Sequence, residues 1–128
     1  MGEYMCLAAC YSWIVNRKVY GEKGPDIECK IVQDIIRAKY NHLLDDELTV
    51  LDAEKYLAFS NPTYCYTVTK LTINSIKDIK DATPVRFDRD GYGHWVVVEN
   101  GKIVFDSLDD SKCVKSGKPT TARIIGAN

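Results

Sequence analysis

Three residues that can act together in nucleophilic catalysis lie near the two ends of this sequence: Cys6, His94 and Asp106. A cysteine attacks a carbonyl group as its thiolate, and a neighbouring imidazole can hold that thiolate as an ion pair and later donate a proton. A carboxylate orients the imidazole by binding its second nitrogen. These residue types therefore predict a catalytic triad, provided that the fold brings them together.

The first of these residues, Cys6, opens a predicted helix. Residues 5–18 contain neither proline nor glycine and carry several apolar side chains, which predicts a mostly buried helix. The N-terminus of a helix stabilises negative charge, so this position suits a thiolate. Cys10 lies one turn further along, and we expect it to be a buried structural residue. Its alternative roles are a second nucleophile or a disulfide partner.

The other two residues are expected to lie on the two strands of one hairpin. Asn100-Gly101 separates these strands and favours a two-residue type I′ turn. In that turn, residues whose numbers sum to 201 face each other, which leaves Asp106 on the opposite face from His94. A three-residue loop over residues 99–101 changes the sum to 200, and His94 then faces Asp106. The triad therefore predicts the three-residue loop, with strand twist or a second bulge as the alternative.

The rest of the sequence predicts helices first and strands afterwards. Asp26 and Thr49 are expected to cap a second and a third helix, the latter with Leu51, Tyr56 and Leu57 facing inward. The spacing of Ile73, Ile76 and Ile79 predicts a short helix within residues 71–80. Strands are predicted at residues 64–70, 84–87, 94–99, 102–105 and 120–125. Helices followed by a mainly antiparallel sheet predict one α+β domain over residues 1–128.

Composition excludes several classes of function. The chain has 128 residues, of which 45% are hydrophobic and 27% charged, as in ordinary globular proteins. A formal net charge of -1 gives no electrostatic reason to expect nucleic acid or an anionic membrane as partner. We find no signal peptide and no apolar run long enough to span a bilayer. The oligomeric state and the cellular location stay open.

The cysteine count favours reduced thiols. Five cysteines cannot all pair within one chain, although a disulfide between Cys29 and Cys65 is an alternative. No pair has the CxxC spacing that is typical of structural zinc sites. We therefore expect neither a metal nor another cofactor.

Two segments resemble the papain-like cysteine peptidases, nearest the bacterial branch of double-glycine leader peptidases and secreted effector proteases. Cys6-Leu7-Ala8-Ala9-Cys10, Trp13-Ile14-Val15 and Tyr20-Gly21 resemble the nucleophile helix of that family. Gly93-His94-Trp95-Val96-Val97-Val98, followed by Asp106, resembles its histidine strand and acidic partner. The resemblance covers roughly 40 residues at the two ends of the chain.

The resemblance implies a papain-like fold and hydrolysis of a peptide or amide bond in a protein or peptide substrate, as in a bacterial toxin or effector domain. Cys6, His94 and Asp106 would form the catalytic triad. Tyr92, Gly93 and Trp95 would contact substrate, with a place in the core as the alternative for Trp95. The family's oxyanion glutamine, six residues before the cysteine, would fall just before Met1.

Two other functions use the same residues. A Cys–His–Asp triad also serves acyl transfer to amines and glutamine deamidation. A binding module that retains the fold without activity is the third interpretation. Within the triad itself, Asp88 and Asp90 are rival acidic partners from the loop before His94.

Overall fold

The computed structural model describes residues 5–108 and 112–127, and it has an α+β architecture. The helices are α1 (Cys6–Tyr20), α2 (Pro25–Tyr40), α3 (Ala53–Ser60) and α4 (Lys112–Ser116). The strands are β1 (Tyr66–Thr72), β2 (Thr83–Arg89), β3 (Tyr92–Glu99), β4 (Lys102–Phe105) and β5 (Lys118–Ala127). Helices therefore precede the strands as expected, except that α4 interrupts the second half.

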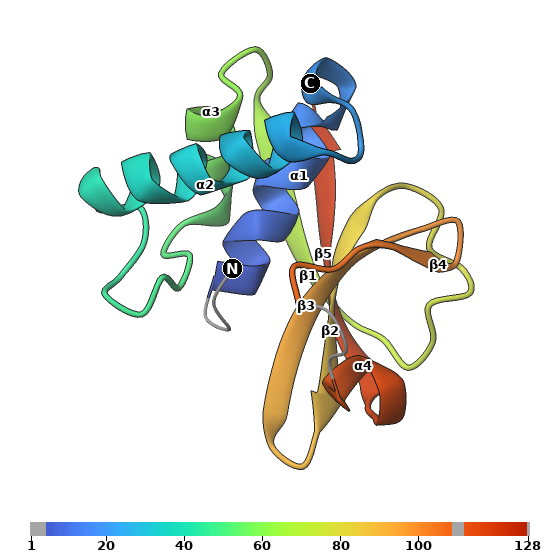
Figure 1. The fold of residues 1–128 in the computed structure, drawn as a ribbon. Coiled ribbons are helices and arrows are strands. Elements are labelled where there is room, and N and C mark those ends of the chain that lie inside the picture. The colour runs from blue at the N-terminus through green and yellow to red at the C-terminus, as the bar shows by residue number, and fades with distance from the viewer. Residues whose placement is uncertain (1–4, 109–111, 128) are drawn as a thin grey trace.

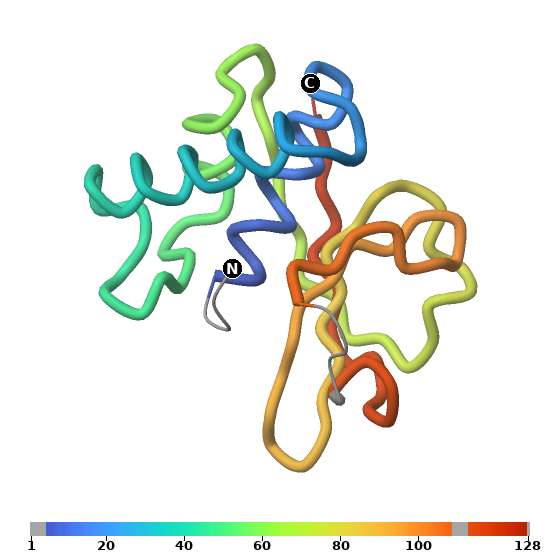
Figure 2. Tube along the Cα trace, in the orientation of Figure 1, coloured from blue at the N-terminus to red at the C-terminus, as the bar shows by residue number. Residues whose placement is uncertain are grey.

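The five strands form one antiparallel sheet in the order β1-β5-β2-β3-β4. The last strand in sequence, β5, lies between β1 and β2. The two halves of the sheet are therefore joined only through this C-terminal strand. Figure 1 shows α1, α2 and α3 gathered together, while α4 lies beside β2 and β3. Figure 2 traces the chain in the same orientation, and α1 contacts β3. The predicted α+β class is confirmed.

Two hydrophobic clusters form the core. The first lies among α1, α2, α3 and the sheet, and includes Trp13, Trp95 and Val97. The second includes Val96 and Val98. Because successive strand residues point to opposite faces, β3 is buried on both sides. This explains why residues 95–98 form a continuous apolar run instead of an alternating one.

Two predicted helix starts are wrong by a few residues. Pro25 opens α2 after Gly24, so Asp26 lies inside the helix and is not its cap. Asp52, and not Thr49, caps α3, where its Oδ1 accepts a hydrogen bond from the N–H of Lys55 at 3.1 Å. A bridge between Leu44 and Val50 holds the segment before Asp52 in an extended form. As a result Leu51 is exposed, contrary to expectation, while Tyr56 and Leu57 are buried as predicted.

The short helix predicted within residues 71–80 is also wrong. β1 continues to Thr72, and the N–H of Ile73 donates to the carbonyl of Thr120 at 3.0 Å, which extends the pairing with β5. Ile73, Ile76 and Ile79 instead pack from an irregular segment against the second cluster. The spacing of three residues therefore allows these side chains to cover the second cluster, and it does not reflect a helix.

The two edges of the sheet differ. At β1, a carboxylate oxygen of Glu54 accepts a hydrogen bond from the N–H of Val68 at 2.8 Å. This side chain from α3 occupies a donor that would otherwise face solvent. At the other edge, β4 is only four residues long and carries a register shift against β3. Short and irregular edge strands pair poorly with other chains.

Candidate active site

Cys6 is the first residue of α1 and is almost completely buried, with 6% of its surface exposed. The preceding Met5 gives no side-chain cap to the helix, and the first turn carries no acidic residue. The amide groups of this turn lack intrahelical acceptors. A negative charge on Cys6 would therefore lie at the positive end of a 15-residue helix without a competing carboxylate from the same turn.

His94 and Asp106 are in direct contact. Nε2 of His94 lies 2.6 Å from Oδ1 of Asp106, within the range of a charge-assisted hydrogen bond. The same oxygen accepts the N–H of Leu108 at 2.9 Å, which fixes the carboxylate one residue beyond the end of β4. His94 itself is buried and has 3% of its surface exposed. The fold thus brings together two of the three predicted residues from segments twelve positions apart.

The turn of the hairpin has two residues, so the three-residue loop that we expected is wrong. Asn100 and Gly101 have φ values of 53° and 73°, as a type I′ turn requires. The pairs Glu99–Lys102 and Val98–Ile103 follow the register whose numbers sum to 201. Asn-Gly thus forms the turn that its local chemistry favours.

A bulge further along β4 places Asp106 on the face of the sheet that carries His94. After the Val98–Ile103 pair, the next pair is Val97–Phe105, so Val104 is an extra residue in β4. Continuing this register places Asp106 opposite residue 96, which shares a face with His94. Diagonal neighbours on one face lie within reach of each other's side chains. The second bulge, our alternative, is what the structure contains.

The charge state of His94 reflects both neighbours. Burial by itself lowers the pKa of this imidazole, but hydrogen bonding and charge from Asp106, and also from Cys6, outweigh burial and raise the pKa from 6.5 to about 9. Nδ1 is buried without a partner of standard hydrogen-bond geometry among the described residues. The interaction with Cys6 is therefore looser than the one with Asp106, and Nδ1 is the nitrogen left to serve the thiol.

The remaining cysteines have other environments. Cys10 is completely buried, and burial raises its pKa well above 9, with further increases from the charges of Cys6 and Asp106. It stays a neutral thiol, which supports the structural role over that of a second nucleophile. All five cysteines are unpaired, so the alternative disulfide between Cys29 and Cys65 is not formed.

The hairpin that carries His94 and Asp106 is docked on α1 at two points. The ring of Phe105 stacks on Trp13 with centroids 5.4 Å apart and an angle of 17°. Further along, both guanidinium nitrogens of Arg17 bind the carboxylate of Glu99, at 3.0 and 2.5 Å. One contact involves β4 and the other β3. The helix of Cys6 and the hairpin are thus held as one unit.

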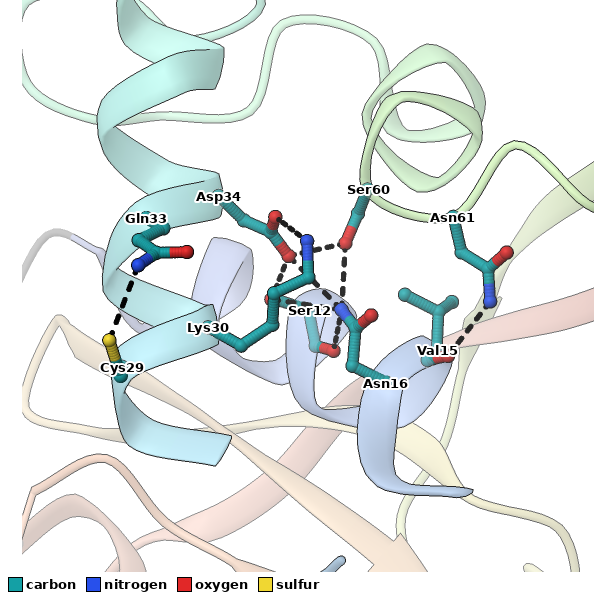
Figure 3. A network of polar contacts seen from close by, with 9 residues as sticks. All are labelled: Ser12, Val15, Asn16, Cys29, Lys30, Gln33, Asp34, Ser60 and Asn61. Carbon is teal, nitrogen blue, oxygen red and sulfur yellow. Dashed lines mark hydrogen bonds and ion pairs between the residues drawn. The ribbon is translucent and has the colours of Figure 1, made fainter. Parts of the chain in front are cut away.

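A buried polar network fixes α1 against the other two long helices (Figure 3). Asp34 of α2 is fully buried and accepts hydrogen bonds from Ser12, Asn16 and Ser60 at 2.5, 3.0 and 2.5 Å. Lys30 neutralises the carboxylate at 2.6 Å. A lysine and an aspartate four residues apart on a helix usually form a surface pair, so this spacing does not indicate a buried network. The signal in the sequence is the presence of Ser12 and Asn16 in a helix that is otherwise expected to be buried.

The three predicted substrate contacts have different surroundings. Tyr92 is 72% exposed at the start of β3. The guanidinium of Arg86 lies where a Cβ of Gly93 would be, so a larger residue here would have to displace the end of that side chain. Trp95 is nearly buried, with the guanidinium of Arg123 over its ring at 4.9 Å. All three lie within two positions of His94 in the sequence, and their contact with substrate stays a prediction.

The rival acids lie elsewhere. Asp88 accepts a hydrogen bond from Nε of Arg86 at 2.9 Å and another from the hydroxyl of Thr120. Asp90 pairs with Arg89 at 3.5 Å. Asp106 is therefore the carboxylate that binds His94.

Comparison of the chain with protein-family models, curated proteins and solved structures finds no match. No helix within residues 5–108 and 112–127 has both the length and the apolar character needed to cross a bilayer. Over the same residues, no three His, Cys, Asp or Glu side chains are grouped so that they could hold a metal ion.

Proposed function

We propose that this chain is a papain-like cysteine peptidase that hydrolyses a peptide or amide bond through an acyl-thioester on Cys6. The observation that carries the proposal is the arrangement around His94. Its Nε2 is 2.6 Å from Asp106, while Cys6, at the start of a helix, interacts with the same ring. With Nε2 bound to Asp106, Nδ1 is the ring nitrogen that would serve the thiol in the proposed reaction.

In the first step, the thiolate of Cys6 attacks the substrate carbonyl, and the new C–S bond leaves a negative charge on the carbonyl oxygen. The backbone N–H groups at the start of α1 are suited to stabilise that charge. The C–N bond then breaks as His94 donates its Nδ1 proton to the departing amine. A pKa of about 9 supports this role, because the ring is protonated at neutral pH.

In the second step, His94 acts as the base. It takes a proton from water, whose oxygen attacks the thioester carbonyl, and the C–S bond breaks to release the acid and the thiolate. The carboxylate of Asp106 holds the ring orientation through both steps and stabilises the imidazolium. Protein and peptide substrates of unknown sequence would enter beside Tyr92, Gly93 and Trp95.

Alkylation with iodoacetamide at pH 7, followed by peptide mass spectrometry, tests the nucleophile. Cys29 and Cys65 are exposed, whereas Cys6 is 6% exposed. Burial alone would make Cys6 one of the slowest thiols. We expect it to react at least about tenfold faster than the exposed pair because, in the proposed mechanism, the imidazole of His94 and the start of α1 activate this sulfur. His94→Ala should abolish this advantage, while Cys10→Ser, the matched control one turn away, should preserve it.

The products then identify the reaction. Incubation with a peptide library should create new N-termini that disappear in Cys6→Ser. Release of ammonia from intact glutamine peptides would instead identify a deamidase. If Cys6 reacts more slowly than Cys29 and Cys65 in the folded protein, the proposal fails and a binding module becomes the better interpretation.

A further inference from the structure

β4 can pair with β3 in two ways. The type I′ turn at Asn100-Gly101 fixes the first two pairs, and a regular strand would continue with their register. The structure instead inserts Val104 as an extra residue before Phe105. A bulge leaves one residue unpaired and interrupts the ladder, so it needs compensation from other contacts.

The two registers differ in which side chain faces α1. A slip of one residue moves every side chain of a strand to the other face. In the regular register Phe105 would face away from Trp13, and Asp106 would face away from His94. In the observed register Phe105 stacks on Trp13 and Asp106 binds His94. The two contacts are therefore made together or lost together.

We infer that the stack between Trp13 and Phe105 selects the bulged register of β4 and so positions Asp106 for its bond with His94. In this role Trp13 and Phe105 are positioning residues that act through Asp106. The register itself follows from the contacts described; only its importance for catalysis rests on the proposed function.

Trp13 is a rigid partner for this selection. It is 1% exposed, and its indole N–H donates to the carbonyl of Glu22 at 3.1 Å. The guanidinium of Arg17 lies 5.1 Å from the centre of the ring and is itself bound to Glu99. The indole is therefore held by the loop after α1 and by Arg17, which is bound to β3. Phe105 is the residue of β4 that contacts the same ring. Stacking of two aromatic rings in this distance range is favourable beyond the area that it buries.

The test measures the imidazole of His94 by NMR as a function of pH. The chain has two histidines, and the exposed His42 serves as an internal reference. In the wild type, His94 should titrate near 9. Phe105→Ile keeps an apolar residue suited to a strand but removes the ring, and should lower the His94 pKa to about 8 or below, a tenfold weaker binding of the proton. Phe105→Tyr keeps the ring and should restore the wild-type value.

Ile103→Ala is the matched control, since Ile103 lies in the same strand before the bulge and is 39% exposed. It should leave the His94 titration unchanged. Cross-strand NOEs between residues 97 and 105 report the register directly, and we expect them to weaken in Phe105→Ile. Should that variant unfold, Phe105→Met, whose flexible side chain fills similar space, takes its place.

The inference is wrong if Phe105→Ile or Phe105→Met folds with the NOEs and the His94 titration of the wild type. It is also wrong if Ile103→Ala lowers the pKa of His94 as much as Phe105→Ile does. Failure of the proposed function has a different signature: Cys6 would react slowly in the wild type while the dependence of His94 on Phe105 persisted. The two results are therefore separable.

Discussion

Replacing Asp106 by asparagine should destabilise the fold in a pH-dependent way. Asparagine keeps an oxygen in a similar place, so it can still accept the N–H of Leu108, but it removes the charge that faces His94. Burial lowers the pKa of His94, and Asp106 is the largest of the influences that raise it, before Cys6. The variant therefore isolates the contribution of one ion pair.

The magnitude follows from the pKa of the imidazole. An increase from 6.5 to about 9 corresponds to about 3 kcal/mol at about 1.4 kcal/mol for each tenfold change in proton binding. Because the pKa is raised in the folded state, this stabilisation is fully present below pH 6.5 and is lost as the pH rises through 9. Asp106 supplies the larger share, so Asp106→Asn should lose about 2 kcal/mol at pH 6.

Urea unfolding of the wild type and of Asp106→Asn, at several pH values between 6 and 10, measures the effect. The difference in unfolding free energy between the two proteins should shrink from about 2 kcal/mol at pH 6 to a few tenths at pH 10. Other groups that titrate in this range contribute to both proteins and cancel in the difference. In His94→Ala, the part of the unfolding free energy that depends on pH between 6 and 10 through this imidazole should be lost as well. A difference that stays constant from pH 6 to 10 would refute the coupling of His94 to Asp106.

Three further predictions concern the scaffold, each measured by urea unfolding. Asp34→Asn removes a buried carboxylate and leaves Lys30 without its partner, so it should lower the free energy of unfolding by about 3 kcal/mol or more. A decrease of less than about 1 kcal/mol would contradict a stabilising role of the network. Asp52→Ala removes the cap of α3 and should cost about 1 kcal/mol, whereas Asp52→Ser should retain most of the stability. Gly93→Ala places a Cβ 2.1 Å from Nε of Arg86 and would displace this group from its bond with Asp88. It should therefore cost about 1 kcal/mol, the worth of one such bond, and cost nothing further in combination with Arg86→Ala. Equal costs in both backgrounds would exclude this explanation.

The parts of the fold that the sequence predicted well depend on local chemistry. Asn100-Gly101 gave the hairpin because few other dipeptides adopt two positive φ values. The helix that begins at Cys6 followed from a segment without proline or glycine. By contrast, the isoleucines of residues 71–80 have a spacing that suits a helix, yet the pairing of β1 with β5 determines their conformation. Tertiary contacts outweighed a weak local preference there.

The candidate site was predictable in its residues but not in its geometry. Cys6, His94 and Asp106 could be chosen by chemical type and position at the ends of elements. The bulge at Val104 has no comparable signature, since a valine in a strand gives no indication that it will remain unpaired. The turn register and the bulge are set at different places along the hairpin. The turn chemistry indicated the two-residue loop that is observed, whereas the requirement that His94 meet Asp106 led us to the wrong, three-residue loop.

The contact between Glu54 and Val68 has a consequence for self-association. The carboxylate of Glu54 accepts a backbone N–H of β1, the outermost strand of the sheet. A strand whose backbone donors are free offers a template for pairing with another chain. The side chain of Glu54 therefore helps to keep two molecules of this protein from joining their sheets.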